Sequence, residues 1–222
     1  MALGAAAAAQ PSPQAGEIPR RKVAILVFEG VELLDFAGPG EVFAAAGRAG
    51  AFDVFTVGVT REPIVSQGFL RITPEHSLAD APRPDLLVIP GGNVGSLLRS
   101  PEAMAWIKAT ARTAEVVMSV CNGALALAEA GLLEGLSATT HHGSIERLRQ
   151  MAPATRVVEG ERFVDNGRMV TAAGVSAGID GALHLVSRLL GEEKAQSTAR
   201  YMEYAWSGAA APQPKAAAAE GR

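Results

Sequence analysis

The stretch EVVMSVCNGALALAEAG at residues 115–131 holds the change from strand to helix that decides the fold. Residues 115–120 form a short, continuous apolar run, which is typical of a buried strand in a parallel sheet. Residues 124–130 have a helical pattern, and Gly131 suits the left-handed position that ends a helix. The stretch therefore predicts a strand, a sharp turn at Cys121 and a helix.

The same alternation of short apolar runs and longer helical patterns extends along most of the chain. It is typical of βα units that build a mostly parallel sheet with helices on both faces, so we predict an α/β fold. We expect one domain over residues 21–206, flanked by disordered tails rich in small residues at 1–20 and 207–222. The expected strands are 22–28, 52–60, 85–90, 115–120, 138–140, 161–164 and 168–173, with a hairpin or edge excursion over 65–73 and a two-residue turn at Asn166 and Gly167. The expected helices are 39–48, 101–114, 124–130, 144–151, 177–190 and 192–204.

The composition excludes several classes of protein. The 222 residues carry 20 Lys and Arg against 23 Asp and Glu, a formal net charge of −3, and 48% of them are hydrophobic. A nucleic-acid-binding protein usually has a concentrated basic patch, and this sequence has no basic run. The apolar runs are also well below the ~20 residues that a membrane span needs. We therefore expect a protein with a sizeable core that binds neither nucleic acid nor membrane.

Cys121 is the single cysteine of the sequence. One cysteine cannot form an internal disulfide or supply a cysteine-rich zinc site, and the histidines show no metal-binding pattern, so we predict no metal. The glycine motifs match no nucleotide-binding signature, which predicts no nucleotide cofactor. Residues 1–9 lack the positive charge of a signal peptide, which predicts a cytoplasmic location. Cys121 is then either a small core residue or a reactive group.

Parallel strands end at one edge of a sheet, where helix N-termini present unpaired backbone N–H groups to ligands. Cys121 follows such a strand at a turn that exposes a side chain, and the helix dipole is expected to lower the pKa of its thiol. The backbone N–H groups of Asn122 and Gly92 are candidate donors to a developing negative charge. The alternative is a buried, inert cysteine, which is common in protein cores.

Asp35 is an acid among apolar neighbours, just before the helix expected at Pro39. On its own, it is best explained as a capping or first-turn acid of that helix. Because the preceding strand is continuous and apolar, we expect it near the centre of the sheet, from which Asp35 would reach Cys121 and exchange protons with it. Glu32 is the competing carboxylate, and Glu29 is a weaker third.

His141 and His142 follow another expected strand. Adjacent side chains of an extended segment point in opposite directions, so we expect only His141 to line the pocket. Residues 174–178, GVSAG, match the G-x-S-x-G nucleophile motif, but the only downstream histidine, His184, lies on the same predicted helix. We therefore expect Ser176 to cap that helix and its loop to form a wall of the pocket.

Several motifs occur together in one order: LDFAGP at 34–39, IPGG at 89–92, SVCNGA at 119–124, ATTH at 138–141 and GVSAGID at 174–180. Together they resemble the DJ-1/PfpI superfamily over about residues 21–204. Within it, the chain is most similar to the isonitrile hydratase branch and to the amidotransferase-like sensor domains of AraC-type regulators. The resemblance implies a flavodoxin-like three-layer sandwich, usually a homodimer, with a nucleophilic cysteine at the turn.

In the hydratase branch an Asp before a Gly-Pro pair partners the cysteine, and these two residues correspond to Asp35 and Cys121. The implied reaction is attack of the thiolate on the terminal carbon of an isonitrile, protonation with help from Asp35, and addition of water to the thioimidate, which releases an N-substituted formamide. Hydratases tend to have Thr after the cysteine and an aromatic residue after the histidine, where this chain has Asn122 and His142. The residues expected to bind substrate are Gly91, Gly92, Asn122, His141, Gly174 and Ser176.

Two other functions fit the sequence. One is a ligand- or redox-sensing module without turnover, like the sensor domains of regulators. The other is a hydrolase, such as a protease or deglycase, or a glyoxalase, as in other branches, which would pair Cys121 with Glu32 and set His141 beside it. The carboxylate next to Cys121 separates the branches, since Asp35 there favours the hydratase and Glu32 favours the others.

Overall fold

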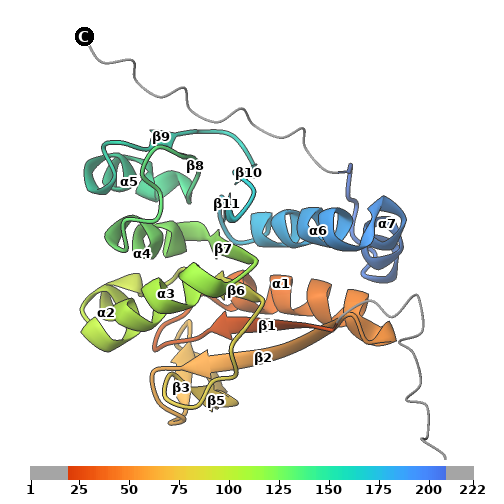
Figure 1. Ribbon diagram of the computed structural model, residues 1–222, viewed down its shortest axis with the longest axis horizontal. Helices are drawn as coiled ribbons and strands as arrows, with labels where there is room; N and C mark the ends of the chain where they lie inside the picture. Colours follow the sequence, from red (N-terminus) through yellow and green to blue (C-terminus); the bar gives the residue numbers. More distant parts are fainter. Residues whose placement is uncertain (1–19, 209–222) are drawn as a thin grey trace, which may run out of the picture.

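The computed structural model describes residues 20–208. A seven-stranded sheet lies between two layers of helices (Figure 1), which confirms the predicted flavodoxin-like α/β sandwich. The tails predicted at 1–20 and 207–222 lie outside the described residues, apart from Arg20, Ser207 and Gly208.

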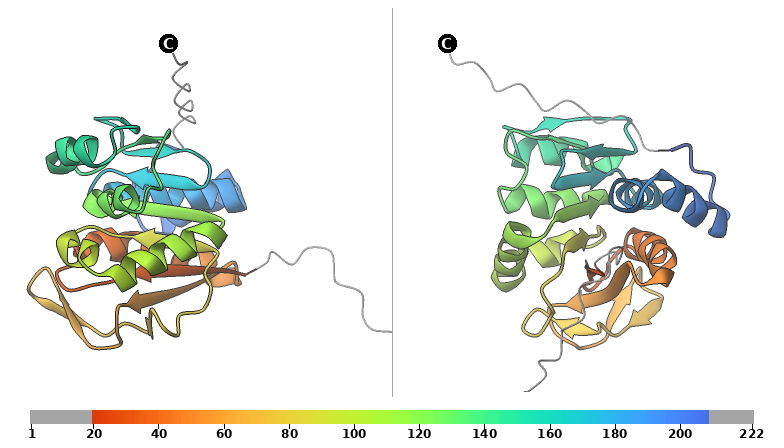
Figure 2. Two further views of the ribbon diagram at one scale, coloured as in Figure 1. Left: turned by 60° about the vertical axis from the view of Figure 1, so that its left-hand side comes forward. Right: turned by 45° about the vertical axis from the view of Figure 1, so that its right-hand side comes forward.

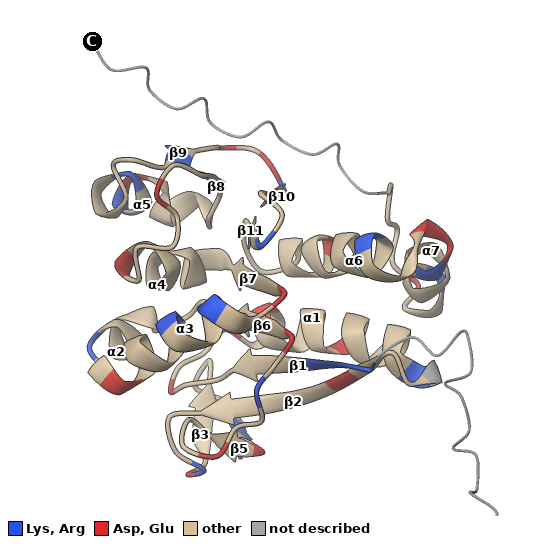
Figure 3. Ribbon diagram, viewed as in Figure 1, with Lys and Arg blue, Asp and Glu red and all other residues tan. Residues whose placement is uncertain are grey.

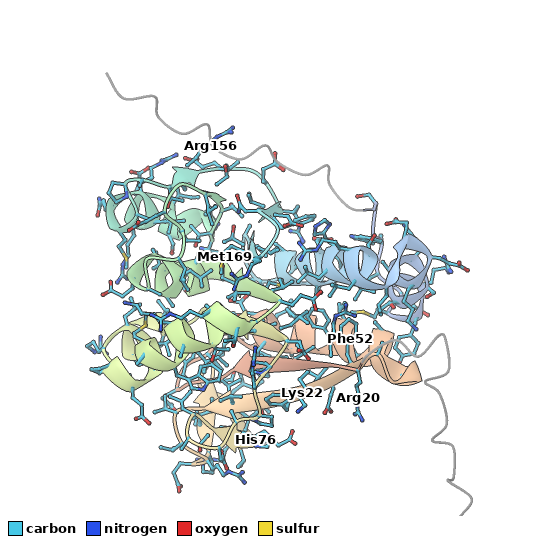
Figure 4. All side chains as sticks on the ribbon, in the orientation of Figure 1. Arg20, Lys22, Phe52, His76, Arg156 and Met169 are labelled. Carbon is cyan, nitrogen blue, oxygen red and sulfur yellow. The ribbon has the colours of Figure 1, made fainter. Side chains whose placement is uncertain are left out.

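The main sheet has the strand order β10-β11-β7-β6-β1-β2-β5, and its neighbouring strands are parallel except for the pair of β10 and β11. Its strands are β1 (Arg21–Leu26), β2 (Phe52–Gly58), β5 (His76–Ser77), β6 (Leu86–Ile89), β7 (Val116–Val120), β10 (Phe163–Asp165) and β11 (Met169–Ala172). Two small sheets pair β3 (Ile64–Ser66) with β4 (Leu70–Ile72) and β8 (Ser137–Ala138) with β9 (Arg156–Val157). In Figure 4, His76 marks the β5 edge of the main sheet and Arg156 marks the β8–β9 sheet at the opposite end.

The helices form two groups, one on each face of the sheet (Figure 2). Parallel strands need crossover connections, and most of these helices supply them. One group contains α1 (Leu33–Ala46), α6 (Ala177–Leu190) and α7 (Glu192–Tyr201). The other contains α2 (Val94–Leu98), α3 (Pro101–Thr113), α4 (Ala124–Glu129) and α5 (Ile145–Met151). Short 3-10 turns cover Gly47–Ala49, Cys121–Gly123 and His142–Ser144.

The central strands are buried because helices cover both faces of the sheet. Every residue of β6 and β7 is buried, as their continuous apolar runs predict. Strand β1 lies between β6 and β2, which confirms the expectation of a place near the centre. Charged residues are dispersed over helices and loops and also lie in strands β1 and β2 (Figure 3). Within residues 20–208, no helix is both long enough and apolar enough to span a bilayer.

The start of α1 differs from the prediction. The helix begins at Leu33 rather than near Pro39, and Pro39 lies in its interior. Proline cannot donate to the carbonyl four residues earlier, so the Asp35 carbonyl has no ordinary helical partner. Asp35 therefore lies in the first turn of the helix instead of ahead of it. The sequence also missed α2 and β5, because five and two residues are too few to show a period.

Gly123 permits the close packing of the turn after β7. A Cβ atom on it would lie 2.2 Å from the Ile89 carbonyl oxygen and 2.8 Å from the Pro90 carbonyl oxygen. Both contacts are with backbone, which cannot rotate away. We expect Gly123→Ala to lower the free energy of unfolding in urea by about 1–3 kcal/mol, the usual cost of overpacking a core.

Gly95→Ala in α2 is the matched control. The nearest atom to its new Cβ would be the mobile end of Arg99, at 3.2 Å. Because Ala is the better helix former, we expect Gly95→Ala to leave the protein equally stable or up to about 1 kcal/mol more stable. Equal losses in the two variants would contradict the special role of Gly123.

Candidate active site

Four loops meet at the carboxyl edge of the sheet, after the neighbouring strands β11, β7, β6 and β1. The loop after β1 leads into Asp35, and the loop after β6 contains Gly91 and Gly92. A bridge between Val31 and Gly92 ties these two loops together. Cys121 follows β7 directly, at the centre of this group.

Cys121 lies at the sharp turn that the sequence predicts. Its φ is +57°, a left-handed conformation that is uncommon for a residue with a side chain. The Thr140 hydroxyl donates a hydrogen bond of 2.8 Å to the Cys121 carbonyl and so helps to hold the turn. The side chain is only 8% exposed, less than the sequence indicates for a residue at such a turn.

Asp35 is the carboxylate that contacts the thiol. It is fully buried and accepts hydrogen bonds from the backbone N–H groups of Gly91, at 2.9 Å, and Val175, at 3.0 Å. The Cys121 thiol lies next to this carboxyl group, close enough for each group to shift the pKa of the other. The Glu32 side chain is instead hydrogen-bonded to the Gln67 amide, and Glu29 accepts a hydrogen bond from the Val65 N–H. Of the three candidate carboxylates, Asp35 therefore lies beside the sulfur.

Burial controls the protonation of both groups. Burial, with a smaller contribution from the negative charge of Glu32, raises the pKa of Asp35 from 3.8 to about 7 against the opposing effect of the Gly91 N–H. Burial also raises the pKa of the Cys121 thiol to about 12, with a further contribution from the Asp35 charge. The expectation of a lowered thiol pKa was therefore wrong. Helix α4 has only six residues, and desolvation outweighs the hydrogen bond that the Asn122 N–H donates to the sulfur.

The Asn122 side chain closes onto Gly92. Its Oδ1 accepts a hydrogen bond from the Gly92 N–H at 2.8 Å, and its Nδ2 donates one to the Gly92 carbonyl at 3.0 Å. The Gly92 N–H is therefore occupied, which differs from its expected role as a free donor beside the Asn122 N–H. A Cβ atom on Gly91 would lie 2.3 Å from Asn122 Oδ1 and 2.9 Å from Asp35 Oδ2, so only glycine fits there. We predicted a role only for the backbone of Asn122, so the contact of its side chain with Gly92 was not expected.

We expected His141 and His142 to point in opposite directions, but they do not. Their ring centroids are 4.1 Å apart, because the chain enters a 3-10 turn at His142 and is no longer extended. His141 Nδ1 accepts a hydrogen bond of 3.2 Å from the Gly143 N–H, so the neutral ring carries its proton on Nε2. Gly174 packs against this ring, where an added Cβ would lie 2.5 Å from His141 Cδ2.

Ser176 precedes α6 but does not cap it. Its side chain makes no capping hydrogen bond and instead accepts one of 3.2 Å from Arg162. The G-x-S-x-G motif has no catalytic partner either, since His184 is hydrogen-bonded to Asp165 at 2.6 Å. Gly174 and Val175 of the same loop line a pocket, as expected, but Ser176 does not.

A pocket of about 350 Å³ lies next to the Cys121–Asp35 pair. Its lining includes Thr140 and Val175, which are hydrogen-bonded to Cys121 and Asp35 respectively, but not Cys121 or Asp35 themselves. Of the residues expected to bind substrate, His141 and Gly174 line this pocket, whereas Gly91, Gly92, Asn122 and Ser176 do not. His142 lines it as well, so the expectation that only His141 would do so was wrong. Thr140, and Arg162 on the far wall, were not predicted as site residues. Across residues 20–208, no group of three or more His, Cys, Asp or Glu residues is placed to hold a metal ion.

Comparison with known proteins identifies the family of this chain. A model of the DJ-1/PfpI family matches residues 21–188. The chain belongs to the DJ-1/PfpI family. Among curated relatives, an isonitrile hydratase of Pseudomonas putida is 34% identical over 185 residues, which cover 83% of this chain and 78% of the relative. A Parkinson disease protein 7 homolog of Danio rerio is 27% identical over 79% of this chain and 93% of the relative.

Other DJ-1/PfpI relatives differ in their assigned roles. The transcriptional regulator GbdR of Pseudomonas aeruginosa is 25% identical over 78% of this chain, but the match spans only 48% of the regulator. Among solved structures, a ThiJ/PfpI family protein of Pseudomonas syringae has a TM-score of 0.77 and 28% identity, covering 94% of this chain and 84% of that one. An AraC family regulator of Pseudomonas putida has a TM-score of 0.72 and 24% identity, covering 82% and 99%. The family thus includes a named enzyme and named regulators.

The buried carboxyl of Asp35 predicts an unusual dependence of stability on pH. Its pKa is higher in the folded protein than in the unfolded chain, so the folded state holds more protons between about pH 4 and 7. This contribution to stability is complete below pH 3.8 and is lost as the pH rises through about 7, a change of at most about 4 kcal/mol. In Asp35→Asn we expect the free energy of unfolding, measured in urea at several pH values, to lack this loss.

Glu32→Gln is the matched control for that experiment. Removing the Glu32 charge lowers the pKa of Asp35 in the folded protein and leaves that of the unfolded chain near 3.8, so the loss of stability should be smaller and should end at a lower pH. A difference between wild type and Asp35→Asn that does not change with pH would contradict a raised pKa for Asp35.

Proposed function

We propose that the protein is a cysteine-dependent lyase that hydrates an isonitrile to an N-substituted formamide through a thioimidate on Cys121. The observation that carries the proposal is the position of the buried Asp35 carboxyl group next to the Cys121 thiol. The 34% identity to an isonitrile hydratase supports it. A homodimer, which the family resemblance implies, and a cytoplasmic location are part of the same proposal.

In the first step, the Asp35 carboxylate takes the proton of the Cys121 thiol as the sulfur attacks the terminal isonitrile carbon. Asp35 then gives that proton to the same carbon, so the S–H bond is exchanged for a C–S and a C–H bond. The product is the thioimidate R–N=CH–S–Cys121, and Asp35 is again ionised. One carboxyl group thus serves first as a base and then as an acid.

In the second step, water adds to the thioimidate carbon and the C–S bond breaks. One hydrogen of the water returns to sulfur and the other goes to nitrogen, which leaves R–NH–CHO and the free thiol. The Nε2–H of His141 is the donor for the oxygen that becomes the formyl oxygen, and the Asn122 N–H stabilises the sulfur as the C–S bond breaks. The Gly92 N–H is not available, since Asn122 occupies it.

Turnover of p-nitrophenyl isocyanide tests the proposal. We expect the wild type to release the formamide, Cys121→Ala to release none, and Asp35→Asn to be at least about 100-fold slower, since general acid–base catalysis is typically worth that much. Glu32→Gln is the matched carboxylate control and should keep most of the activity. Formamide release by Cys121→Ala at the rate of the wild type would exclude the mechanism.

The pH profile of kcat/KM reports the protonation state that the free enzyme needs. Because the first step starts from the Asp35 carboxylate, kcat/KM should rise with pH to a plateau, with a midpoint near 7. In Glu32→Gln the midpoint should move to lower pH, since a neighbouring negative charge is gone. A profile that falls through pH 7 would mean that protonated Asp35 is the active form.

A sensing module without turnover is the second candidate, favoured by the similarity to transcriptional regulators. A hydrolase or glyoxalase that pairs Cys121 with Glu32 has less support, since the Glu32 side chain is bonded to Gln67. A redox sensor needs a thiolate near neutral pH, and burial raises the pKa of Cys121 to about 12.

We therefore expect mild peroxide at pH 7 to leave the intact mass of the wild type unchanged. Asp35→Asn should be oxidised faster, because it removes the negative charge next to the sulfur. Rapid addition of oxygen to the wild-type protein would instead support the redox-sensing function.

A further inference from the structure

Arg162 lines the pocket at the active site, yet the proposed reaction does not use it. The same pocket is lined by Thr140 and Val175, which are hydrogen-bonded to Cys121 and Asp35. Cys121 and Asp35 do not line this pocket themselves, so it would hold the tail of a molecule whose reactive end lies at Cys121, beside Arg162.

The Arg162 guanidinium is held in place by three residues from two segments of the chain. Its Nε donates a hydrogen bond of 2.6 Å to Asp180 in the first turn of α6. Its Nη2 donates to the Ser176 hydroxyl at 3.2 Å and to the Tyr204 hydroxyl at 3.5 Å. These contacts fix the plane of the group, so the remaining N–H groups have a defined direction at little further cost in entropy.

The Nη1 atom of Arg162 has no hydrogen-bond partner within residues 20–208, although its Nε and Nη2 atoms have several. A guanidinium carries five N–H donors and no acceptor, so Nη1 can only bind an accepting atom. The side chain is half exposed, which leaves this atom accessible to a ligand.

The charges around the pocket indicate which kind of acceptor fits. Asp180 offsets the positive charge of Arg162, and Glu161 also lines the pocket. The nearby Glu159 is paired with Arg149. The charge of Arg162 is offset by Asp180, and the negative charge of Glu161 remains. The pocket therefore repels an anion and suits a neutral hydrogen-bond acceptor.

We propose that Arg162 is a specificity-determining residue that binds a neutral hydrogen-bond acceptor, such as an amide carbonyl or a hydroxyl, on the tail of the isonitrile substrate. Ile145, Ala173 and Val175 give the pocket an apolar wall. The substrate class is then an isonitrile with an apolar middle and a neutral polar end. This inference rests on the proposed function.

Three isonitriles of equal size test it: phenyl isocyanides with a 4-acetamido, a 4-isobutyl or a 4-carboxymethyl group. In the wild type we expect kcat/KM to be highest for the acetamido substrate and lowest for the anionic one. In Arg162→Met the preference for acetamido over isobutyl should fall about tenfold, as for the loss of one hydrogen bond to a charged group, while kcat/KM for isobutyl stays nearly the same.

Tyr204→Phe is the matched control, because it removes one support of Arg162 and keeps Nη1. It should retain the preference. If Arg162 served only to hold the loop, Arg162→Met would slow all three substrates equally, and that result would overturn the proposal. If Arg162→Met does not fold, Arg162→Lys replaces it, since Lys keeps the charge beside Asp180 but lacks the fixed second donor.

A binding measurement separates this inference from the proposed reaction. The formamides of the acetamido and isobutyl compounds are titrated calorimetrically into wild type and Arg162→Met. Tighter binding of the acetamido compound to the wild type only would support the role of Arg162 even if no isonitrile is hydrated, in which case the proposed reaction fails alone. Equal binding in both proteins would overturn the role of Arg162.

Discussion

The burial of the Asp35 carboxylate is the constraint on which the rest of the site depends. A buried carboxyl group needs hydrogen-bond partners, and this one takes them from the loops after β6 and β11, through Gly91 and Val175. Strand β7 lies between those two strands. A group that is bonded to the loops on both sides of β7 must lie over its end, which is where Cys121 begins. The contact between acid and thiol is thus fixed by strand order.

The same constraint explains two features that cost conformational energy. Val175 has a φ of +50°, which is unfavourable for a β-branched residue, and Cys121 has a φ of +57°. Val175 keeps its strained conformation while its N–H is bonded to Asp35, and Gly174 beside it leaves room for the His141 ring. Glycine is required at position 91 because any side chain there would enter the space of the Asp35 carboxylate.

Most of the fold follows from local patterns in the sequence. The buried strands and the helix end at Gly131 depend on residues close together in the chain, and each occurs where expected. The hairpin of β10 and β11 also forms, but Asn166 pairs with Met169, so the turn lies at Gly167 and Arg168, one residue later than predicted. The start of α1 was misplaced because a proline usually lies in the first turn of a helix, whereas Pro39 lies deeper. Tertiary packing allows this, since the helix is held by α6 and α7.

The site was predictable in its residue types and less so in its chemistry. Strand ends identify Cys121, Asp35 and Gly91 as neighbours, because the topology of a parallel sheet brings its carboxyl ends together. The direction of the thiol pKa depends on how much water the folded chain excludes, and no local pattern contains that information. Arg162 and Ser176 are hydrogen-bonded to each other although they are 14 residues apart in the chain. No helical or strand periodicity links two residues at that spacing, so their roles could not be predicted.

A thiol with a pKa of about 12 beside a carboxyl with a pKa of about 7 favours one kind of chemistry over another. The resting pair keeps its proton on sulfur, so the site holds no standing thiolate for oxidants or unrelated electrophiles. Moving the proton to Asp35 costs at most about 7 kcal/mol by the difference of the two values. That leaves room within a total barrier of about 15 kcal/mol, which corresponds to a kcat on the order of 10–100 per second. The proton on Asp35 then lies next to the new C–S bond. A reaction that adds sulfur and hydrogen to the same carbon needs its proton at that place, and the isonitrile carbon is such an acceptor.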